Sequence, residues 1–141
     1  MAPAFRSGYE RTVAACLTSL GIPIAYELAK FKFYVPETGR LCAQCAGTSV
    51  VRISTYMPDF KLSEFVFLEA KGKLTASNRR RMVAFSEAYK GVKLIFMFQR
   101  DNWLTSKKLG KYSDWAKAKG FPYVVGDRIT REFLSKEGVS C

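Results

Sequence analysis

The sequence predicts an α/β domain with a mixed β-sheet flanked by helices. Segments of helical periodicity alternate with short apolar segments typical of strands, in the order helix, strands, helix, strand, helix, strand, helix. The short, almost wholly apolar run 92–98 predicts a central strand that is covered on both faces. The 141 residues contain no repeat, low-complexity segment or dividing linker, so we expect a single domain, residues 1–141.

The first element predicted is an N-terminal helix that runs to about Leu20. Apolar side chains recur there at helical spacing, and Gly21 followed by Pro23 ends the helix. Ser7 and Glu10 fit a capping box, in which the glutamate side chain returns to the N-cap amide. This pattern predicts a structural role for Glu10.

The next stretch is expected to be extended. Residues 24–35 are rich in aromatic side chains and predict one long strand or two strands that meet at a bend. A turn is predicted at 36–39 and a strand at 49–56. Between them, Cys42 and Cys45 form a CxxC pair, which supplies two of the four ligands of a structural Zn²⁺. A two-fold dimer could place two pairs around one ion; the simpler interpretation is two small residues in a loop.

The second half of the chain predicts alternating helices and strands. A helix begins at Thr75 or Ser77 and ends by Tyr89-Lys90-Gly91. After the strand 92–98, the polar residues 99–110 predict a loop or lid. The remaining predicted elements are a helix at 112–119 capped by Ser113 and ended by Gly120, a strand at 123–125 and a helix at 130–136.

The stretch 58–71 carries the chemistry of greatest interest. Asp59 follows a proline, and Glu69 and Lys71 end a short apolar run. Residues i and i+2 of a strand point to one face, so Glu69 and Lys71 are expected to lie side by side. A hairpin that brings Asp59 beside them gathers two carboxylates and one ammonium group, as in a divalent-metal phosphodiesterase site. The alternative is an ordinary surface ion pair between Glu69 and Lys71, worth under about 1 kcal/mol.

Composition limits the classes of function that the protein can have. Lysine and arginine number 23 against 12 acidic residues, a net charge of +11, which favours a polyanionic partner such as nucleic acid. The chain contains no histidine, so hydrolases that use an imidazole base are excluded. No apolar run approaches the roughly 18 residues of a membrane span, and the N-terminus has no signal-peptide core. We therefore expect an intracellular protein with no membrane partner.

Several cations are candidate phosphate contacts. Arg79, Arg80 and Arg81 come early in the predicted helix, where they oppose the helix dipole, so either an anion compensates them or they form a solvated face. The full set of candidate nucleic-acid-binding residues is Arg6, Arg79, Arg80, Arg81, Lys107, Lys108 and Lys111.

These motifs resemble a known family. Pro58-Asp59 followed by Glu69-Ala70-Lys71 matches the PD-(D/E)xK pattern of the restriction-endonuclease-like superfamily. Four blocks also come in the order seen in the phage endonuclease I family of Holliday-junction resolvases. These blocks are Phe5-Arg6-Ser7-Gly8-Tyr9-Glu10, Tyr56-Met57-Pro58-Asp59-Phe60, Glu69-Ala70-Lys71-Gly72 and Tyr112-Ser113-Asp114-Trp115. The resemblance extends from Phe5 to about Phe133.

The resemblance implies a restriction-endonuclease-like fold and a domain-swapped homodimer. The N-terminal helix and first strand, about 5–35, would be exchanged between protomers, so Glu10 would join Asp59, Glu69 and Lys71 of the other chain. The family has a further acidic residue where this chain has Ala25. Glu27, two residues on, would face the same side of a strand and could substitute for it.

The resemblance also implies a mechanism and a setting. Asp59, Glu69 and the carbonyl of Ala70 would hold one Mg²⁺, with Mn²⁺ as a substitute, and Glu10 would help to hold a second. Lys71 would orient or deprotonate water, or stabilise developing charge. The implied function is cleavage of four-way and other branched DNA during recombination, in the cytoplasm of a phage-infected cell. Two alternatives remain: a PD-(D/E)xK nuclease acting on nicked, damaged or linear duplex DNA, and a non-catalytic DNA-binding module.

Overall fold

The computed structural model describes residues 5–41 and 49–140. Its elements in chain order are α1 (Gly8–Ser19), β1 (Phe31–Leu41), β2 (Ser49–Tyr56), β3 (Phe60–Lys61), β4 (Val66–Lys71), α2 (Ala76–Ala88), β5 (Lys93–Phe98), α3 (Tyr112–Lys119), β6 (Tyr123–Val125) and α4 (Arg131–Lys136). Cys42 and Cys45 lie outside the described residues, so the zinc site stays a prediction.

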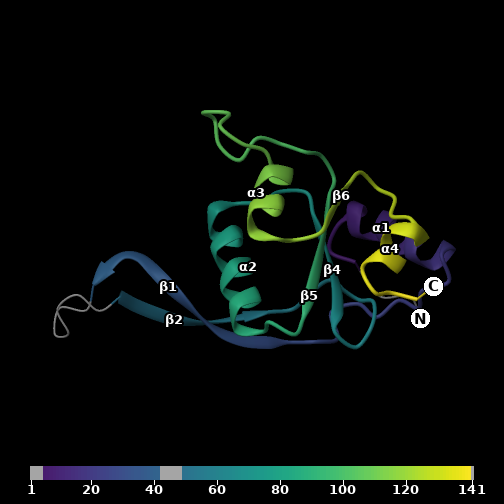
Figure 1. Cartoon of the computed structure of the whole chain (residues 1–141), viewed down its shortest axis with the longest axis horizontal. Helices are drawn as coiled ribbons and strands as arrows, with labels where there is room; N and C mark the ends of the chain where they lie inside the picture. Colours follow the sequence, from purple (N-terminus) through teal and green to yellow (C-terminus); the bar gives the residue numbers. More distant parts are fainter. Residues whose placement is uncertain (1–4, 42–48, 141) are drawn as a thin grey trace.

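A four-stranded mixed sheet forms the centre of the molecule. Its strand order is β3-β4-β5-β6, with β3 antiparallel to β4 and the other neighbours parallel. Helices α1 and α4 lie on one side of this sheet, and α2 and α3 lie on the other (Figure 1). The predicted α/β class, with a mixed sheet flanked by helices, is confirmed.

Side chains of β4 alternate between the two faces of the sheet, so this strand contributes to the hydrophobic core on each face. Leu68 packs with α1 and α4 residues such as Leu17 and Leu134, whereas Phe67 packs with Phe85 of α2 on the opposite face. The neighbouring strand β5 is buried from Leu94 to Phe98, as predicted for a central strand covered on both faces. The same alternation places Glu69 and Lys71 on the α2 side of the sheet.

Strands β1 and β2 form a separate antiparallel ribbon that extends from the body (Figure 1). The predicted strand 49–56 is confirmed. Of the two forms predicted for 24–35, the bend is present, because Glu27 has a φ of +50°, but only one strand is: β1 begins at Phe31, and the residues before the bend form only an isolated bridge between Tyr26 and Phe60. The turn predicted at 36–39 is wrong: β1 continues to Leu41, and the ribbon register shifts between Pro36 and Leu41. An edge strand tolerates a proline, which has no amide to donate.

The ends of the helices agree with the capping residues predicted from the sequence, with one exception. Thr75 caps α2 and forms a capping box with Asn78. Gly120, with a φ of +77°, ends α3 in the left-handed conformation that glycine adopts readily. Ser113 does not cap α3, however; the N-cap is Lys111, and Ser113 instead donates to Asp101 through its amide and its hydroxyl. None of the helices in the described ranges is long and apolar enough to cross a membrane.

Candidate active site

The β3–β4 hairpin assembles the acidic cluster. Phe60 pairs with Leu68 and Lys61 with Phe67, so the residue before β3, Asp59, lies opposite Glu69. The Asp59 amide donates to Glu69 Oε1 over 3.2 Å. The predicted hairpin is therefore confirmed, and it brings together two carboxylates that are ten residues apart in sequence.

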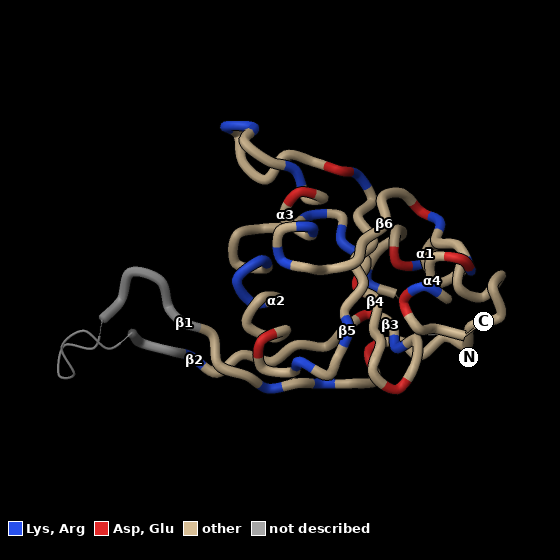
Figure 2. Tube along the Cα trace, in the orientation of Figure 1, with Lys and Arg blue, Asp and Glu red and all other residues tan. Residues whose placement is uncertain are grey.

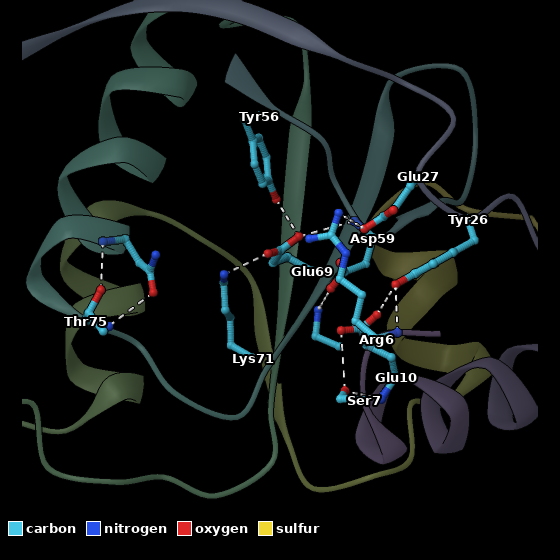
Figure 3. Close-up of polar contacts among 12 residues, drawn as sticks. Arg6, Ser7, Glu10, Tyr26, Glu27, Tyr56, Asp59, Glu69, Lys71 and Thr75 are labelled. Atoms are coloured by element: carbon cyan, nitrogen blue, oxygen red, sulfur yellow. Dashed lines mark hydrogen bonds and ion pairs between the residues drawn. The ribbon is translucent and has the colours of Figure 1, made fainter. Parts of the chain in front are cut away.

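Glu69 is held by three donors, as Figure 3 shows. The hydroxyl of Tyr56 donates to Oε1 over 2.7 Å, the Asp59 amide donates to the same oxygen, and Lys71 Nζ lies 2.9 Å from Oε2. Burial and the Glu69 carboxylate raise the pKa of Tyr56 well above its usual range, so the phenol stays a donor. The ion pair between Glu69 and Lys71 is therefore present, but it is not a surface pair, because Glu69 is only 4% exposed.

Asp59 is buried beside this carboxylate. Its Oδ2 accepts a hydrogen bond from the Ala70 amide over 2.9 Å, and the residue is 7% exposed. Burial, and then the charge of Glu69, raise the pKa of Asp59 to about 8. Two neighbouring buried carboxylates disfavour each other's ionised form, and a cation bound beside them would favour the ionised form of both.

Glu10 approaches the cluster from α1. Ser7 caps this helix and accepts from the Glu10 amide over 3.1 Å, and the Ser7 hydroxyl lies 3.3 Å from Glu10 Oε1. The other carboxylate oxygen, Oε2, accepts from the hydroxyl of Tyr26. The side chain is thus fixed by two hydroxyl groups, and half of the predicted capping box, the Ser7 contact, is present.

A pocket of about 350 Å³ connects these groups. It is lined by Arg6, Glu10, Lys30, Thr55, Tyr56, Met57, Asp59, Glu69, Ala70, Lys71 and Arg81. Four predicted catalytic side chains, Glu10, Asp59, Glu69 and Lys71, therefore share one cavity within a single chain. The structure is of one chain, and the exchange of residues 5–35 between protomers stays a prediction.

Glu27 is placed differently from the predicted acidic substitute. It is not among the residues that line this pocket, and its carboxylate lies 2.9 Å from Arg6 Nη2. Its amide donates to the Asp59 carbonyl, and the bend at Glu27 redirects the chain immediately afterwards. In this structure Glu27 pairs with the Arg6 guanidinium, which does line the pocket.

The predicted phosphate contacts divide into three groups. Arg6 and Arg81 line the pocket, and the Arg81 guanidinium carbon lies 5.8 Å from the centroid of the Tyr56 ring. Arg79 and Arg80 line a different groove between α2 and α3. The three lysines belong to the loop 99–111 that connects β5 to α3. Figure 2 shows the Lys and Arg positions spread over α2 and this loop.

The sequence interpretation missed two tyrosines and a lysine. Tyr56 and Tyr26 donate to the catalytic candidates Glu69 and Glu10, and Lys30 lines the pocket. Tyr56 belongs to one of the resembling blocks, three residues before Asp59, which was an available signal. Nothing in the sequence pairs Tyr26 with Glu10, because that hydrogen bond links a helix to the segment after its end.

The donor set fits a Mg²⁺ ion. Within 5–41 and 49–140, no three acidic or cysteine side chains are grouped as in a closed metal site. Mg²⁺ is instead commonly held by one or two carboxylates and several waters, which Asp59 and Glu69 can provide together with the Ala70 carbonyl. The raised pKa of Asp59 supports this fit, because a divalent cation would offset the repulsion between the carboxylates.

Comparisons with known proteins agree with the motifs. Residues 1–139 match the model of the family described as phage endonuclease I. The chain is 29% identical over 119 residues to endodeoxyribonuclease 1 of Enterobacteria phage T3, covering 83% of this chain and 68% of the relative. It is 30% identical over 136 residues to endonuclease I of Escherichia phage T7, covering 96% of this chain and 70% of the relative. The four-residue cluster thus belongs to a chain that matches one family along almost its whole length, and the protein is a member of the phage endonuclease I family.

Proposed function

We propose that this protein is a Mg²⁺-dependent, structure-selective endodeoxyribonuclease that resolves four-way and other branched DNA junctions as a homodimer. The observation that carries the proposal is the convergence of Asp59, Glu69, Lys71 and Glu10 in one pocket, also lined by basic side chains, of a phage endonuclease I family member. The two relatives are named as endonucleases, which supports DNA as the substrate. The cytoplasm of a phage-infected cell is the proposed setting, in keeping with relatives from two phages.

The pocket residues have distinct roles in this mechanism. Asp59, Glu69 and the carbonyl of Ala70 would hold Mg²⁺, which when bound polarises the scissile phosphate and favours ionisation of water. Lys71 Nζ is anchored by Glu69 at 2.9 Å and can donate to the attacking water or to the charge that builds on the phosphate.

The remaining groups position the DNA and the acids. Glu10, on α1, adds a third carboxylate to the pocket, and Tyr56 keeps the Glu69 carboxylate in place through its hydrogen bond. Arg6 and Arg81 line the same pocket and are placed to contact phosphate oxygens. The net charge of +11 agrees with affinity that comes mainly from the DNA backbone.

The β1–β2 ribbon supports the dimer. Tyr34 and Ile53 are direct cross-strand partners, and each is 67% exposed. Leu28, just before β1, is 73% exposed. Apolar side chains gathered on a projecting ribbon are typical of a surface that another protein covers, and a second copy of this chain is the partner that the proposed exchange of residues 5–35 provides.

The direct test of this function is a junction cleavage assay. A labelled four-way junction and its isolated linear arms are each incubated with the protein in Mg²⁺, in Mn²⁺ and in EDTA. We expect paired incisions near the branch point with either metal and none in EDTA, because the proposed mechanism depends on a divalent cation held by Asp59 and Glu69. Equal cleavage of junction and arms would favour a nuclease for linear or nicked duplex, and binding without cleavage would favour a non-catalytic module.

Tyr26 provides a finer test of the Glu10 role. Tyr26→Phe removes the hydroxyl that donates to Glu10 and accepts from the Arg6 amide over 3.3 Å, while the ring contacts with Phe5 and Phe60 remain. Burial raises the pKa of this phenol, so it is a donor at neutral pH. We expect the junction cleavage rate at saturating protein to fall about tenfold, a change of roughly 1.4 kcal/mol in the barrier, with junction affinity unchanged.

The matched control is Tyr89→Phe, which removes another tyrosine hydroxyl, one that donates to the Lys32 carbonyl away from the pocket. This variant should cleave at the wild-type rate. A Tyr26→Phe protein that is equally active would show that Glu10 needs no brace from Tyr26.

A further inference from the structure

The loop 99–111 carries exposed apolar side chains that the proposed mechanism does not use. Trp103 is 45% exposed and Leu109 is 86% exposed. The loop projects from the body beside α3 (Figure 1), and Figure 2 shows its tip in the colour of lysine and arginine. Its charged residues are Arg100, Asp101, Lys107, Lys108 and Lys111. This surface therefore combines an exposed indole with an excess of positive charge.

Backbone contacts hold the indole in place. The Tyr112 amide donates to the Asn102 carbonyl over 3.0 Å, and the Leu104 amide donates to the Gly110 carbonyl over 2.8 Å. Between these contacts Trp103 pairs with Lys111 in an antiparallel bridge. Hydrogen bonds across the two arms of the loop order the segment before any partner arrives, so little conformational entropy is left to lose at Trp103.

The base of the loop is anchored to α3. The Asp101 carboxylate accepts from the Ser113 amide over 2.9 Å and from the Ser113 hydroxyl over 2.6 Å. The Asp101 carboxylate is therefore hydrogen-bonded to Ser113 at the base of the loop. Its negative charge does not neutralise the lysines nearer the tip, which can bind an anionic partner.

A cation accompanies the indole ring. Lys111 Nζ lies 5.0 Å from the centroid of the Trp103 ring. Bases that stack on aromatic side chains bring their phosphates with them, so an indole with adjacent lysines matches both parts of a nucleotide. The charge favours nucleic acid over an apolar protein surface as the partner of this loop.

The loop also leaves the sheet on the side of the active site. The Gln99 amide donates to the Lys71 carbonyl over 3.1 Å, and Phe98 is the strand partner of Lys71. The chain thus enters the loop immediately beyond the strand position that faces the catalytic lysine. DNA bound at the pocket would pass close to the base of the loop.

We propose that Trp103 is a stacking platform for a nucleobase exposed at a DNA branch point, with Lys107, Lys108 and Lys111 contacting the neighbouring phosphates. This inference rests on the proposed function and adds a source of substrate selectivity to it. An intact duplex hides the faces of its bases, whereas a branch point interrupts the stack and offers a face. Stacking at the loop therefore discriminates junctions from linear arms without reading their sequence.

Fluorescence tests the platform directly. The chain has two tryptophans, and Trp115 is buried, so Trp115→Phe leaves Trp103 as the only indole. We expect its emission to be quenched at saturation with a four-way junction in EDTA, and much less at saturation with a linear arm. If Trp115→Phe does not fold, the wild-type protein is compared with Trp103→Phe, in which the junction-dependent quenching should disappear. The absence of junction-dependent quenching that requires Trp103 would overturn the proposal.

Affinity measurements provide a second, independent test of the platform. Trp103→Ala should weaken junction binding by at least about fivefold, and Trp103→Phe by less, with linear-arm binding and the salt dependence unchanged because no charge is removed. Lys107→Ala is the matched control in the same loop. It removes a proposed phosphate contact, so it should weaken junction binding and lower the salt slope on the junction by about 0.9, whereas Trp103→Ala leaves that slope unchanged. Equal losses on junction and arm for Trp103→Ala would show a structural role and overturn the proposal.

The two proposals fail in different ways. If the protein cleaves junctions and Trp103→Ala binds them as tightly as the wild type, the platform is wrong and the proposed function stands. If the wild-type protein neither prefers nor cleaves junctions, the proposed function is wrong, and the branch-point platform is wrong with it.

Discussion

Asp59→Asn is expected to abolish cleavage of a four-way junction in Mg²⁺ while junction binding is retained. The Asp59 Oδ2 accepts from the Ala70 amide, and the asparagine side-chain oxygen can accept the same hydrogen bond. The substitution therefore keeps the hairpin geometry and removes only the negative charge that would hold the cation. Loss of metal-assisted stabilisation worth several kcal/mol corresponds to a rate at least about 10³-fold lower.

Glu64→Gln is the matched control for this variant. Glu64 lies between β3 and β4 in the same hairpin, and it is exposed. Neutralising it should leave cleavage at the wild-type rate, which shows that the loss is specific to the buried carboxylate. Binding is measured by fluorescence anisotropy and cleavage by gel electrophoresis of the same labelled junction. Unchanged cleavage by Asp59→Asn would refute the assigned site.

The elements that the sequence predicted best are those with local causes. The hairpin 58–71 follows from a proline, a short apolar run and i, i+2 alternation, and it delivered Asp59 beside Glu69 as expected. Strand 49–56 also follows from alternation along its own residues. Such patterns depend on one or two neighbouring strands, and for this reason they can be read from the sequence.

The parts that were missed depend on contacts between distant segments. Tyr26 reaches Glu10 across 16 residues, and Glu27 turns to Arg6 because a left-handed bend redirects the chain at that position. The turn predicted at 36–39 was wrong because the strand continues to Leu41: Pro36 pairs with Val51 and Leu41 with Ser49, and a shift in register between these pairs accommodates the residues in between. Local propensity is weaker than such pairing, so composition alone could not locate these features.

The second large effect concerns the origin of Glu10 in each active site. We expect a heterodimer of Glu10→Gln and Asp59→Asn chains to nick junctions, although each homodimer is inactive. With residues 5–35 exchanged, one site of this heterodimer contains both substitutions, and the other contains the wild-type Glu10 and the wild-type Asp59. Without exchange, each site contains one substitution and the heterodimer is inactive. Co-expression with two different affinity tags isolates the heterodimer, and a labelled junction reports its nicking.

The structure suggests why this exchange would preserve the site. Glu10 is braced by Ser7 and Tyr26, and all three residues lie within the segment 5–35. The segment thus carries an already positioned carboxylate, whichever chain it comes from. Its contacts with the body include the Glu27 amide donating to the Asp59 carbonyl, a backbone interaction that either protomer can supply.

A reciprocal heterodimer makes the test independent of expression level and folding. One chain carries both Glu10→Gln and Asp59→Asn, and its partner is wild type. With exchange, each site then contains one substitution, and this heterodimer should be inactive. Without exchange, the wild-type chain keeps a complete site and nicks the junction. The two heterodimers contain the same two substitutions, so opposite activities can arise only from how Glu10 and Asp59 are shared between chains. Activity in the reciprocal heterodimer alone would show that each chain builds its own site, as the single chain does here.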